Sequence, residues 1–146
     1  AEIEAGLHGG GDVLSGFSAN GRLEQRPDLL SDYRQRLLES VGSARLDGTK
    51  VVLDLCWGSA TSCGESVFRE LGADLTVLHG EPDGTRINQS CGSTHLEALQ
   101  AAVMAQGAAM GFAFDGDADR MLAVDGRGRV VDGDQILYLW GQAPVR

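Results

Sequence analysis

The chain has 146 residues, of which 42% are hydrophobic and 23% are charged, and its formal net charge is −9 at pH 7. This length fits one domain, which can bury roughly 70% of the surface that the unfolded chain exposes. The acidic balance argues against nucleic acid or an anionic membrane surface as the main partner, and no apolar run reaches the roughly 18 residues that span a bilayer.

The cysteines indicate the compartment. Cys56, Cys63 and Cys91 are odd in number and lack C-x-x-C spacing, so packed or semi-exposed thiols are expected rather than a disulfide framework. No secretory signal pattern is recognisable at the N-terminus. Together these features predict a cytoplasmic protein.

Residues 1–26 are predicted to be a linker or a tail from a preceding domain. A short helix at residues 1–7 would end at consecutive glycines, and the residues that follow show no clear periodicity. From Pro27 a helix is expected, because proline suits the first turn and an apolar stripe follows it. The stripe consists of Leu30, Tyr33, Leu37 and Val41.

A β-α-β unit is expected next. Residues 50–56, KVVLDLC, form the nearly continuous apolar run of a buried parallel strand. Ser62 and Glu65 have the spacing of a capping box at the start of a helix that ends at Gly72. The buried side of this helix is predicted to consist of Val67, Phe68 and Leu71. Residues 73–78 supply a second strand, which a right-handed crossover places parallel to the first.

After a polar loop at residues 79–93, the same alternation continues. Thr94 and Glu97 repeat the capping-box spacing, and the helix that they begin runs to Gly107. Leu96, Leu99 and Val103 are the residues that it is expected to direct at the core. A strand at residues 111–114 follows.

The remaining elements form the end of the domain. A strand at 121–124 is expected to return through a hairpin-type turn into residues 130–131. Asp132 can cap a final apolar helix at 133–140, which packs on this sheet or on a neighbouring domain. Residues 27–146 are therefore predicted to form one α/β domain with a small, mixed, mainly parallel sheet flanked by helices.

The strongest chemical signal lies at residues 111–126, GFAFDGDADRMLAVDG. An apolar run leads into Asp115, Asp117 and Asp119, Arg120 follows directly, and a second apolar run comes next. On a helix these alternate positions do not share a face, and on a strand two residues advance the chain by about 6.6 Å. Because Mg²⁺ holds its oxygens at about 2.0–2.1 Å, the carboxylates can meet on one cation only if the backbone turns sharply. Gly116 permits such a turn, and Ala118, which costs more at positive φ, is small enough not to crowd it.

Other kinds of acidic loop fit this segment less well. A solvated acidic turn in a hairpin is the simplest, but three clustered carboxylates without a cation would raise one another's pKa. An EF-hand needs glycine and glutamate where this chain has Arg120 and Gly126. A haloacid-dehalogenase-type phosphatase would continue with Gly-Thr and needs a downstream lysine, whereas the only lysine, Lys50, lies upstream. A cation site is therefore favoured.

Three segments carry a family resemblance: INQSCGSTHLEALQ (87–100), FAFDGDADR (112–120) and VDGDQILYLWG (131–141). They resemble the second domain of the phosphoglucosamine mutases, a branch of the α-D-phosphohexomutase superfamily, over roughly residues 48–141. This sequence departs from the pattern at Ala118, where glycine is commonest, and at Trp57, where a polar residue often stands.

The resemblance implies a phosphoryl-transfer enzyme that interconverts glucosamine 6-phosphate and glucosamine 1-phosphate through a phosphoserine and a bisphosphate intermediate. It implies that Asp115, Asp117 and Asp119 bind Mg²⁺ and that Arg120 is a cation beside the transferring phosphate. It also implies that missing sibling domains carry the catalytic serine and read the phosphosugar substrate, so this chain alone is expected to show no turnover.

Two alternatives stay open. The chain could belong to another phosphohexomutase, a phosphomannomutase or phosphoglucomutase. It could also be a non-catalytic acidic α/β module that binds a divalent cation or a partner protein. Other polar candidates are expected to be ordinary surface, loop or packing residues; these are His79, Arg86, Asn88, Cys91 and His95.

Overall fold

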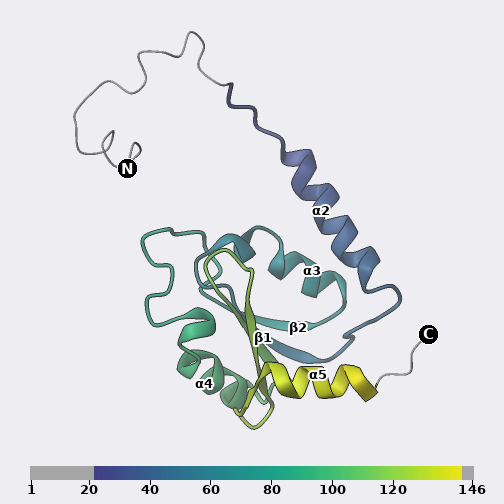
Figure 1. The fold of residues 1–146 in the computed structure, drawn as a ribbon, viewed down its shortest axis with the longest axis vertical. Coiled ribbons are helices and arrows are strands. Elements are labelled where there is room, and N and C mark those ends of the chain that lie inside the picture. The colour runs from purple at the N-terminus through teal and green to yellow at the C-terminus, as the bar shows by residue number, and fades with distance from the viewer. Residues whose placement is uncertain (1–21, 143–146) are drawn as a thin grey trace, which may run out of the picture.

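A five-stranded sheet in the order β2-β1-β3-β4-β5 forms the centre of the molecule (Figure 1). The computed structural model describes residues 22–142, so the predicted short helix at 1–7 and most of the predicted linker lie outside the described residues. The strands are β1 (Lys50–Asp54), β2 (Asp74–Leu78), β3 (Met110–Phe114), β4 (Met121–Asp125) and β5 (Val130–Val131). The helices are α2 (Pro27–Ser40), α3 (Gly64–Glu70), α4 (Glu97–Gln106) and α5 (Gly133–Gln142), with short 3₁₀ helices η1 (Ser59–Ser62) and η2 (Gly92–Thr94).

The sheet is mixed, as predicted. β1 pairs in parallel with β2 on one side and with β3 on the other, whereas β4 pairs antiparallel with both β3 and β5. Only β4 therefore runs against the other strands of the sheet. The predicted β-α-β crossover from β1 to β2 is present, and β1 ends at Asp54, two residues earlier than the apolar run suggested.

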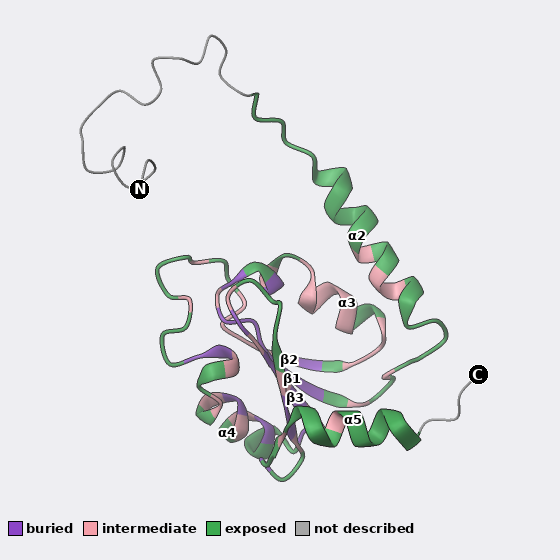
Figure 2. Ribbon diagram, in the orientation of Figure 1, coloured by how far each residue is buried: buried purple, intermediate pink, exposed green. Residues whose placement is uncertain are grey.

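Two apolar layers cover the two faces of the sheet, with α3 on one side and α4 on the other (Figures 1 and 2). Alternate residues of β1 point to opposite faces, so Val52 packs with α4 while Val51 and Leu53 pack on the α3 side. Leu99 and Val103 of α4 are fully buried, and each such side chain stabilises the fold by about 1.5–3 kcal/mol. Because both faces are covered, the loops at the strand ends are held on a rigid frame.

Both predicted capping boxes in the middle of the chain are wrong. Ser62 belongs to η1 and donates from its hydroxyl to the carbonyl of Ser59 (2.7 Å), and no side chain caps α3. Thr94 belongs to η2, and its hydroxyl lies 3.1 Å from Nδ1 of His95 instead of capping α4. Local hydrogen bonds of this kind compete with capping, so the spacing of Ser/Thr and Glu was not enough to predict these caps.

The predicted cap of the last helix is confirmed. Oδ1 of Asp132 accepts the N–H of Gln135 (2.9 Å), and Oε1 of Gln135 accepts the N–H of Asp132 (3.0 Å). This reciprocal pair satisfies donors that the first turn of α5 would otherwise leave open.

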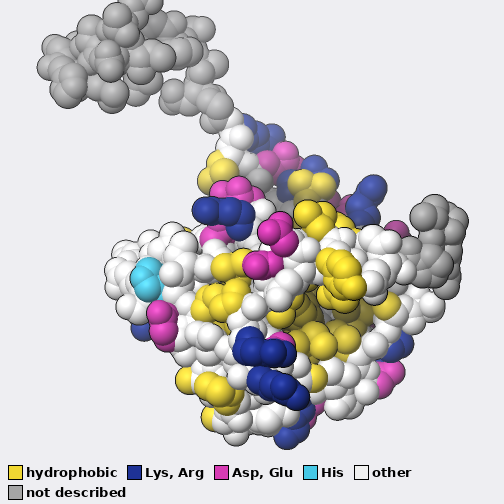
Figure 3. Space-filling view, turned by 60° about the horizontal axis from the view of Figure 1, so that its bottom comes forward, with side chains coloured by type: hydrophobic (Ala, Val, Ile, Leu, Met, Phe, Trp, Pro, Cys, Tyr) yellow, Lys and Arg dark blue, Asp and Glu magenta, His cyan; other side chains and the backbone are white. Residues whose placement is uncertain are grey.

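Helices α2 and α5 leave large apolar side chains uncovered within the described residues. The predicted stripe of α2 is not a buried face, because Tyr33 is 54% exposed and no residue of the helix is buried. Trp140 of α5 is 71% exposed, and apolar side chains line a groove of about 340 Å³ between α5 and β4. Figure 3 shows hydrophobic side chains gathered around a hollow on this part of the surface. Among residues 22–142, none of the helices has the length and apolar content needed to cross a bilayer.

Candidate metal centre

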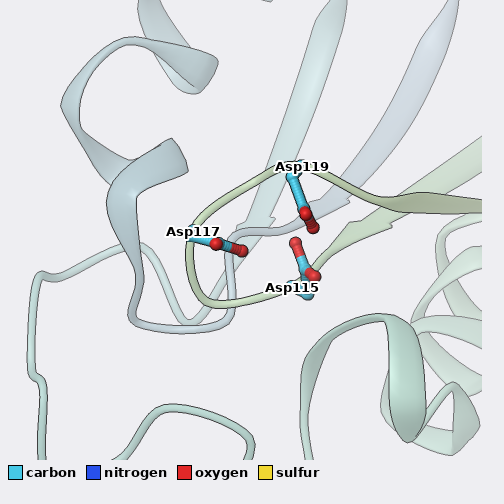
Figure 4. A group of neighbouring side chains, drawn as sticks. All are labelled: Asp115, Asp117 and Asp119. Carbon is cyan, nitrogen blue, oxygen red and sulfur yellow. The ribbon is translucent and has the colours of Figure 1, made fainter.

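The three aspartates lie on the loop that joins β3 to β4. The last pair of the ladder joins Phe114 to Met121, and the N–H of Asp115 donates to the carbonyl of Arg120 (3.3 Å) just beyond it. Asp115, Asp117 and Asp119 each offer one carboxylate oxygen within 4.8 Å of the others. Figure 4 shows the three side chains directed toward one another from the two arms of the loop. The sharp turn that their spacing requires is therefore present.

Gly116 and Asp117 are the central residues of the turn, and Ala118 follows them in an unusual conformation. Ala118 has a left-handed backbone with φ of 60°, and its N–H donates to the carbonyl of Asp115 (3.2 Å). This conformation costs an L-residue roughly 1–2 kcal/mol, which glycine avoids. Gly116 also packs closely, because a Cβ there would lie 2.5 Å from Cγ2 of Ile87. The turn thus includes Gly116, as expected, and Ala118 is its left-handed residue.

Asp115 is the anchored member of the group, since its side chain is only 3% exposed. Oδ2 accepts Nε–H of Arg120 (2.8 Å), and Oδ1 accepts the backbone N–H of Arg120 (3.2 Å). Burial opposes ionisation of Asp115, but the Arg120 N–H, a hydrogen bond with Asp119 and the guanidinium outweigh it, so its pKa lies below the ordinary value. Asp115 is therefore an oriented, ionised acceptor.

Asp117 and Asp119 are exposed, and their carboxylates lie beside Asp115. Neither of them receives the two hydrogen bonds from Arg120 that Asp115 accepts. The pKa of Asp119 is raised, first through its hydrogen bond with Asp115 and further by the charge on Asp117, although Arg120 opposes the shift at 3.3 Å. Excess negative charge in one place is the condition that a divalent cation relieves. Carboxylate oxygens are also the ligands that Mg²⁺ prefers, so the residues present fit that ion.

The loop that follows β1 supports the aspartate loop. The N–H of Ser59 donates to the carbonyl of Gly116 (2.9 Å), and a Cβ on Gly58 would collide with that same carbonyl. Both residues follow β1, so the carboxyl ends of β1 and β3 meet here, where ligands gather in open α/β sheets. A shallow cavity of about 400 Å³ lies alongside, lined by Ser93, Thr94, Arg120, Met121 and Leu122.

Sequence reasoning missed a hydrogen-bonded pair, Asp54 and His79, beside this loop. Asp54, fully buried at the end of β1, accepts the N–H groups of Cys56 (3.0 Å) and Gly92 (2.9 Å) and lies 2.8 Å from Nδ1 of His79. His79 thus has a partner that its position in the sequence did not reveal. An aspartate at the end of a buried strand was the available signal, since such ends converge at one edge of the sheet.

Trp57, the unusual residue of the loop after β1, packs against His79 and Arg86. Its ring lies 5.3 Å from that of His79, centroid to centroid, and the guanidinium of Arg86 stands 3.7 Å over its face. Stacking of this kind stabilises by about 0.5–1 kcal/mol at exposed sites. The structure therefore gives Arg86 a packing role, as expected for an ordinary loop residue.

Comparison with known proteins places these features in a family. Residues 31–128 match the family model described as "Phosphoglucomutase/phosphomannomutase, alpha/beta/alpha domain II". A phosphoglucosamine mutase of Synechococcus sp. (strain CC9311) is 70% identical over 139 residues, which cover 95% of this chain and 30% of that protein. The phosphoglucosamine mutase of Synechococcus sp. (strain WH7803) is 66% identical over 143 residues, with 98% and 31% covered. The chain thus spans about a third of the length of these relatives.

Solved structures show the same fold. A phosphoglucomutase/phosphomannomutase family protein from Burkholderia thailandensis superposes with a TM-score of 0.67 at 31% identity, covering 77% of this chain and 25% of that one. A putative phosphomannomutase from Thermus thermophilus superposes with a TM-score of 0.60 at 16% identity, covering 85% and 30%, and this likeness concerns the fold alone. The predicted α/β class and domain type are confirmed.

Proposed function

The chain belongs to the phosphoglucomutase/phosphomannomutase family through its domain II, and on that premise we propose that it is the metal-loop domain of a phosphosugar mutase. The observation that supports this most directly is the convergence of three carboxylates beside Arg120. The proposed reaction interconverts glucosamine 6-phosphate and glucosamine 1-phosphate, because relatives 66–70% identical bear the name phosphoglucosamine mutase. Since the chain spans about a third of those relatives, the reaction is proposed for a longer protein.

Asp115, Asp117 and Asp119 would hold Mg²⁺ in this proposal. The ion, when bound, neutralises negative charge on a transferring phosphoryl group, which is the main requirement of such reactions. Asp115 is fixed in orientation by two donors of Arg120, so one ligand is in place before any cation arrives. Asp117 and Asp119 are exposed and can adjust around it.

Arg120 would donate hydrogen bonds directly to the phosphate. Its side chain is 72% exposed while Nε is bonded to Asp115, so the remaining guanidinium N–H groups can donate to phosphate oxygens. Ser93 and Thr94 line the same cavity and offer hydroxyls to a sugar or a phosphate. The chain would thus position an anion at the edge of the sheet, with its metal ligands on one side and hydroxyls on the other.

The remaining partners follow from the same proposal. A preceding domain would carry the phosphoserine, and further domains would read the sugar. The exposed apolar residues of α2 and α5 are suited to contact such domains. A cytoplasmic location fits the free thiols of Cys56, Cys63 and Cys91.

Two measurements test the proposal. Calorimetric titration of this chain with Mg²⁺ should show weak saturable binding, about millimolar or about 4 kcal/mol, which Asp117→Asn abolishes. Asp134→Asn, which removes the same charge at the exposed start of α5, is the matched control and should bind like the unsubstituted chain.

The decisive assay uses the full-length protein that contains this domain. Asp117→Asn should lower turnover of glucosamine 6-phosphate at least about 100-fold, with Asp134→Asn near the unsubstituted rate. Full activity of Asp117→Asn would contradict the assigned role of the loop. Turnover of mannose or glucose phosphates in preference to glucosamine phosphate would overturn the choice of sugar and leave the metal site standing.

A further inference from the structure

Two buried thiols face each other behind the aspartate loop. Cys56 and Cys91 are both fully buried, and their Sγ atoms lie 3.7 Å apart although 35 positions separate them in the sequence. We propose that Cys56 and Cys91 are a reversible dithiol–disulfide pair, a modification site distinct from the metal centre. An S–S bond measures about 2.05 Å, so the two sulfurs need to approach by roughly 1.7 Å.

The backbone around the sulfurs is unusual. Cys56, Asn88 and Ser90 all have left-handed conformations, with φ of 54°, 61° and 53°. Each costs about 1–3 kcal/mol in a residue other than glycine and persists only where its surroundings impose it. The two thiols are therefore brought together by a strained arrangement of two loops.

The contacts of the sulfurs assign them different roles. Sγ of Cys56 accepts the backbone N–H of Asn88 (3.4 Å) and contacts the thiol of Cys91. Burial, followed by the hydrogen bond to Cys56, raises the pKa of Cys91 to about 11, so Cys91 keeps its proton. Sγ of Cys56 also lies 3.4 Å from Oδ1 of Asn88, a residue of the covering loop. We assign Cys56 as the attacking sulfur, because opening of that loop frees both of these contacts.

The loop that covers the pair gives an oxidant its access. Residues 81–90 lack regular strand or helix structure and are mostly exposed, so they can open without unfolding the sheet. With glutathione disulfide as oxidant, the Cys56 thiolate attacks one sulfur and expels a glutathione thiolate. The expelled glutathione thiolate takes the proton of Cys91. The Cys91 thiolate then attacks Sγ of Cys56 and expels the second glutathione, which takes up the proton that Cys56 released. Two protein thiols are oxidised, and one glutathione disulfide is reduced to two glutathiones.

The bond would act on the segment that touches the aspartate loop. Gly92 follows Cys91, and a Cβ added to Gly92 would collide with Sγ of Cys56 and with the carbonyl of Phe114, the residue that precedes Asp115. Drawing Cys91 toward Cys56 therefore restrains the backbone on which Asp115 is carried.

The test uses the folded chain with Cys63→Ser, because Cys56 and Cys63 fall in one tryptic peptide, residues 51–69. After incubation with glutathione disulfide, the intact mass should fall by about 2 Da, the two hydrogens lost. Trypsin should yield that peptide linked to residues 87–120, which contain Cys91. The thermal midpoint should rise by about 5 °C or more and return after reduction with dithiothreitol. Cys91→Ala in the same background is the matched control and should show no loss of mass.

The unsubstituted chain provides a second measurement. Alkylation after oxidation should label Cys63 alone, since it is partly exposed and outside the pair. The proposal is overturned if the folded chain keeps all its thiols, forms only glutathione adducts or intermolecular dimers, or forms the Cys56–Cys91 bond only in denaturant.

Discussion

Nε of Arg120 lies 2.8 Å from Oδ2 of Asp115 and thereby places a positive charge on the one buried carboxylate of the aspartate loop. The same nitrogen lies 3.3 Å from Oδ1 of Asp119. Without a cation, the loop is thus held by an internal counter-ion, and an incoming metal competes with it for two of the three carboxylates. Several expected outcomes depend on this competition.

Arg120→Gln should strengthen Mg²⁺ binding by this chain while it lowers turnover in the full-length protein. Removing a unit charge about 4 Å away in near-aqueous surroundings favours a divalent cation by about 2 kcal/mol, or about thirtyfold, whereas a phosphate loses its donor. Calorimetry measures the Mg²⁺ affinity, and a mutase assay measures the turnover. Arg127→Gln is the matched control, because it removes the same charge in the turn after β4. Within residues 22–142 its side chain has no ion pair, so this variant should change neither Mg²⁺ affinity nor turnover. Weaker Mg²⁺ binding by Arg120→Gln would contradict the competition.

Asp119→Asn should raise stability and lower metal affinity together. The raised pKa of Asp119 reports unfavourable charge beside Asp115, and an amide at this position can instead donate to that carboxylate. We expect a higher urea midpoint without metal and at least about tenfold weaker Mg²⁺ binding. A fall in both quantities would show that Asp119 is a structural residue of the turn.

Ala118→Gly should stabilise the chain. Relief of the left-handed conformation outweighs the greater freedom of glycine in the unfolded chain, for a net gain of about 0.5–1 kcal/mol in the free energy of unfolding. Urea unfolding measures the difference. Ala101→Gly in the exposed part of α4 is the opposite control and should cost about 1 kcal/mol. Destabilisation of Ala118→Gly would mean that the methyl group makes contacts that outweigh the strain.

Asp54→Ala should destabilise strongly, because it leaves buried N–H groups of Cys56 and Gly92 without an acceptor and removes the partner of His79. We expect a loss of about 3–5 kcal/mol in the free energy of unfolding. Asp74→Ala, at the exposed start of β2, should stay within about 0.5 kcal/mol of the unsubstituted chain. Similar urea midpoints for the two variants would refute a structural role for the buried carboxylate.

Acidification should weaken Mg²⁺ binding before it unfolds the chain. The pKa of Asp119 is raised, so this ligand takes up its proton at a higher pH than an ordinary aspartate, and affinity falls in that window. The pKa of Asp115 is lowered, so its contribution to stability is fully present above the ordinary aspartate pKa and is lost only as the pH falls through the lowered value. Calorimetry and circular dichroism across this range should therefore give separate transitions, and a single shared transition would contradict the assignment.

Much of the fold could be predicted because its signals are local. The apolar run of β1 and the glycine that ends α4 indicated elements that the structure confirms, with Gly107 in the left-handed cap at φ of 59°. The spacing of the aspartates required a turn, and a turn is present. What spacing could not show was the contact of Gly116 with Ile87, a residue of a distant loop.

The contacts beside the site join residues far apart in the sequence, so no single segment shows both partners. Asp54 and His79 come from the ends of β1 and β2, and Cys91 reaches Cys56 from a loop that precedes η2. These pairs depend on the order of strands in the sheet, since parallel neighbours bring their carboxyl ends to one edge. The strand order of the sheet had to be known before either pair of residues could be predicted.

The pairing register of β3 and β4 fixes the length of the loop between them. Phe114 faces Met121, so the segment between them must cross from one strand to the other in six positions, residues 115–120. Adding or removing one residue would turn every later side chain of β4 to the opposite face and would put Ala123 or Asp125 in the place of the fully buried Val124. Substitutions inside the loop leave this register intact, whereas changes of length do not. Variation at this site is therefore expected to occur by replacement of residues, as at Ala118, and not by insertion or deletion.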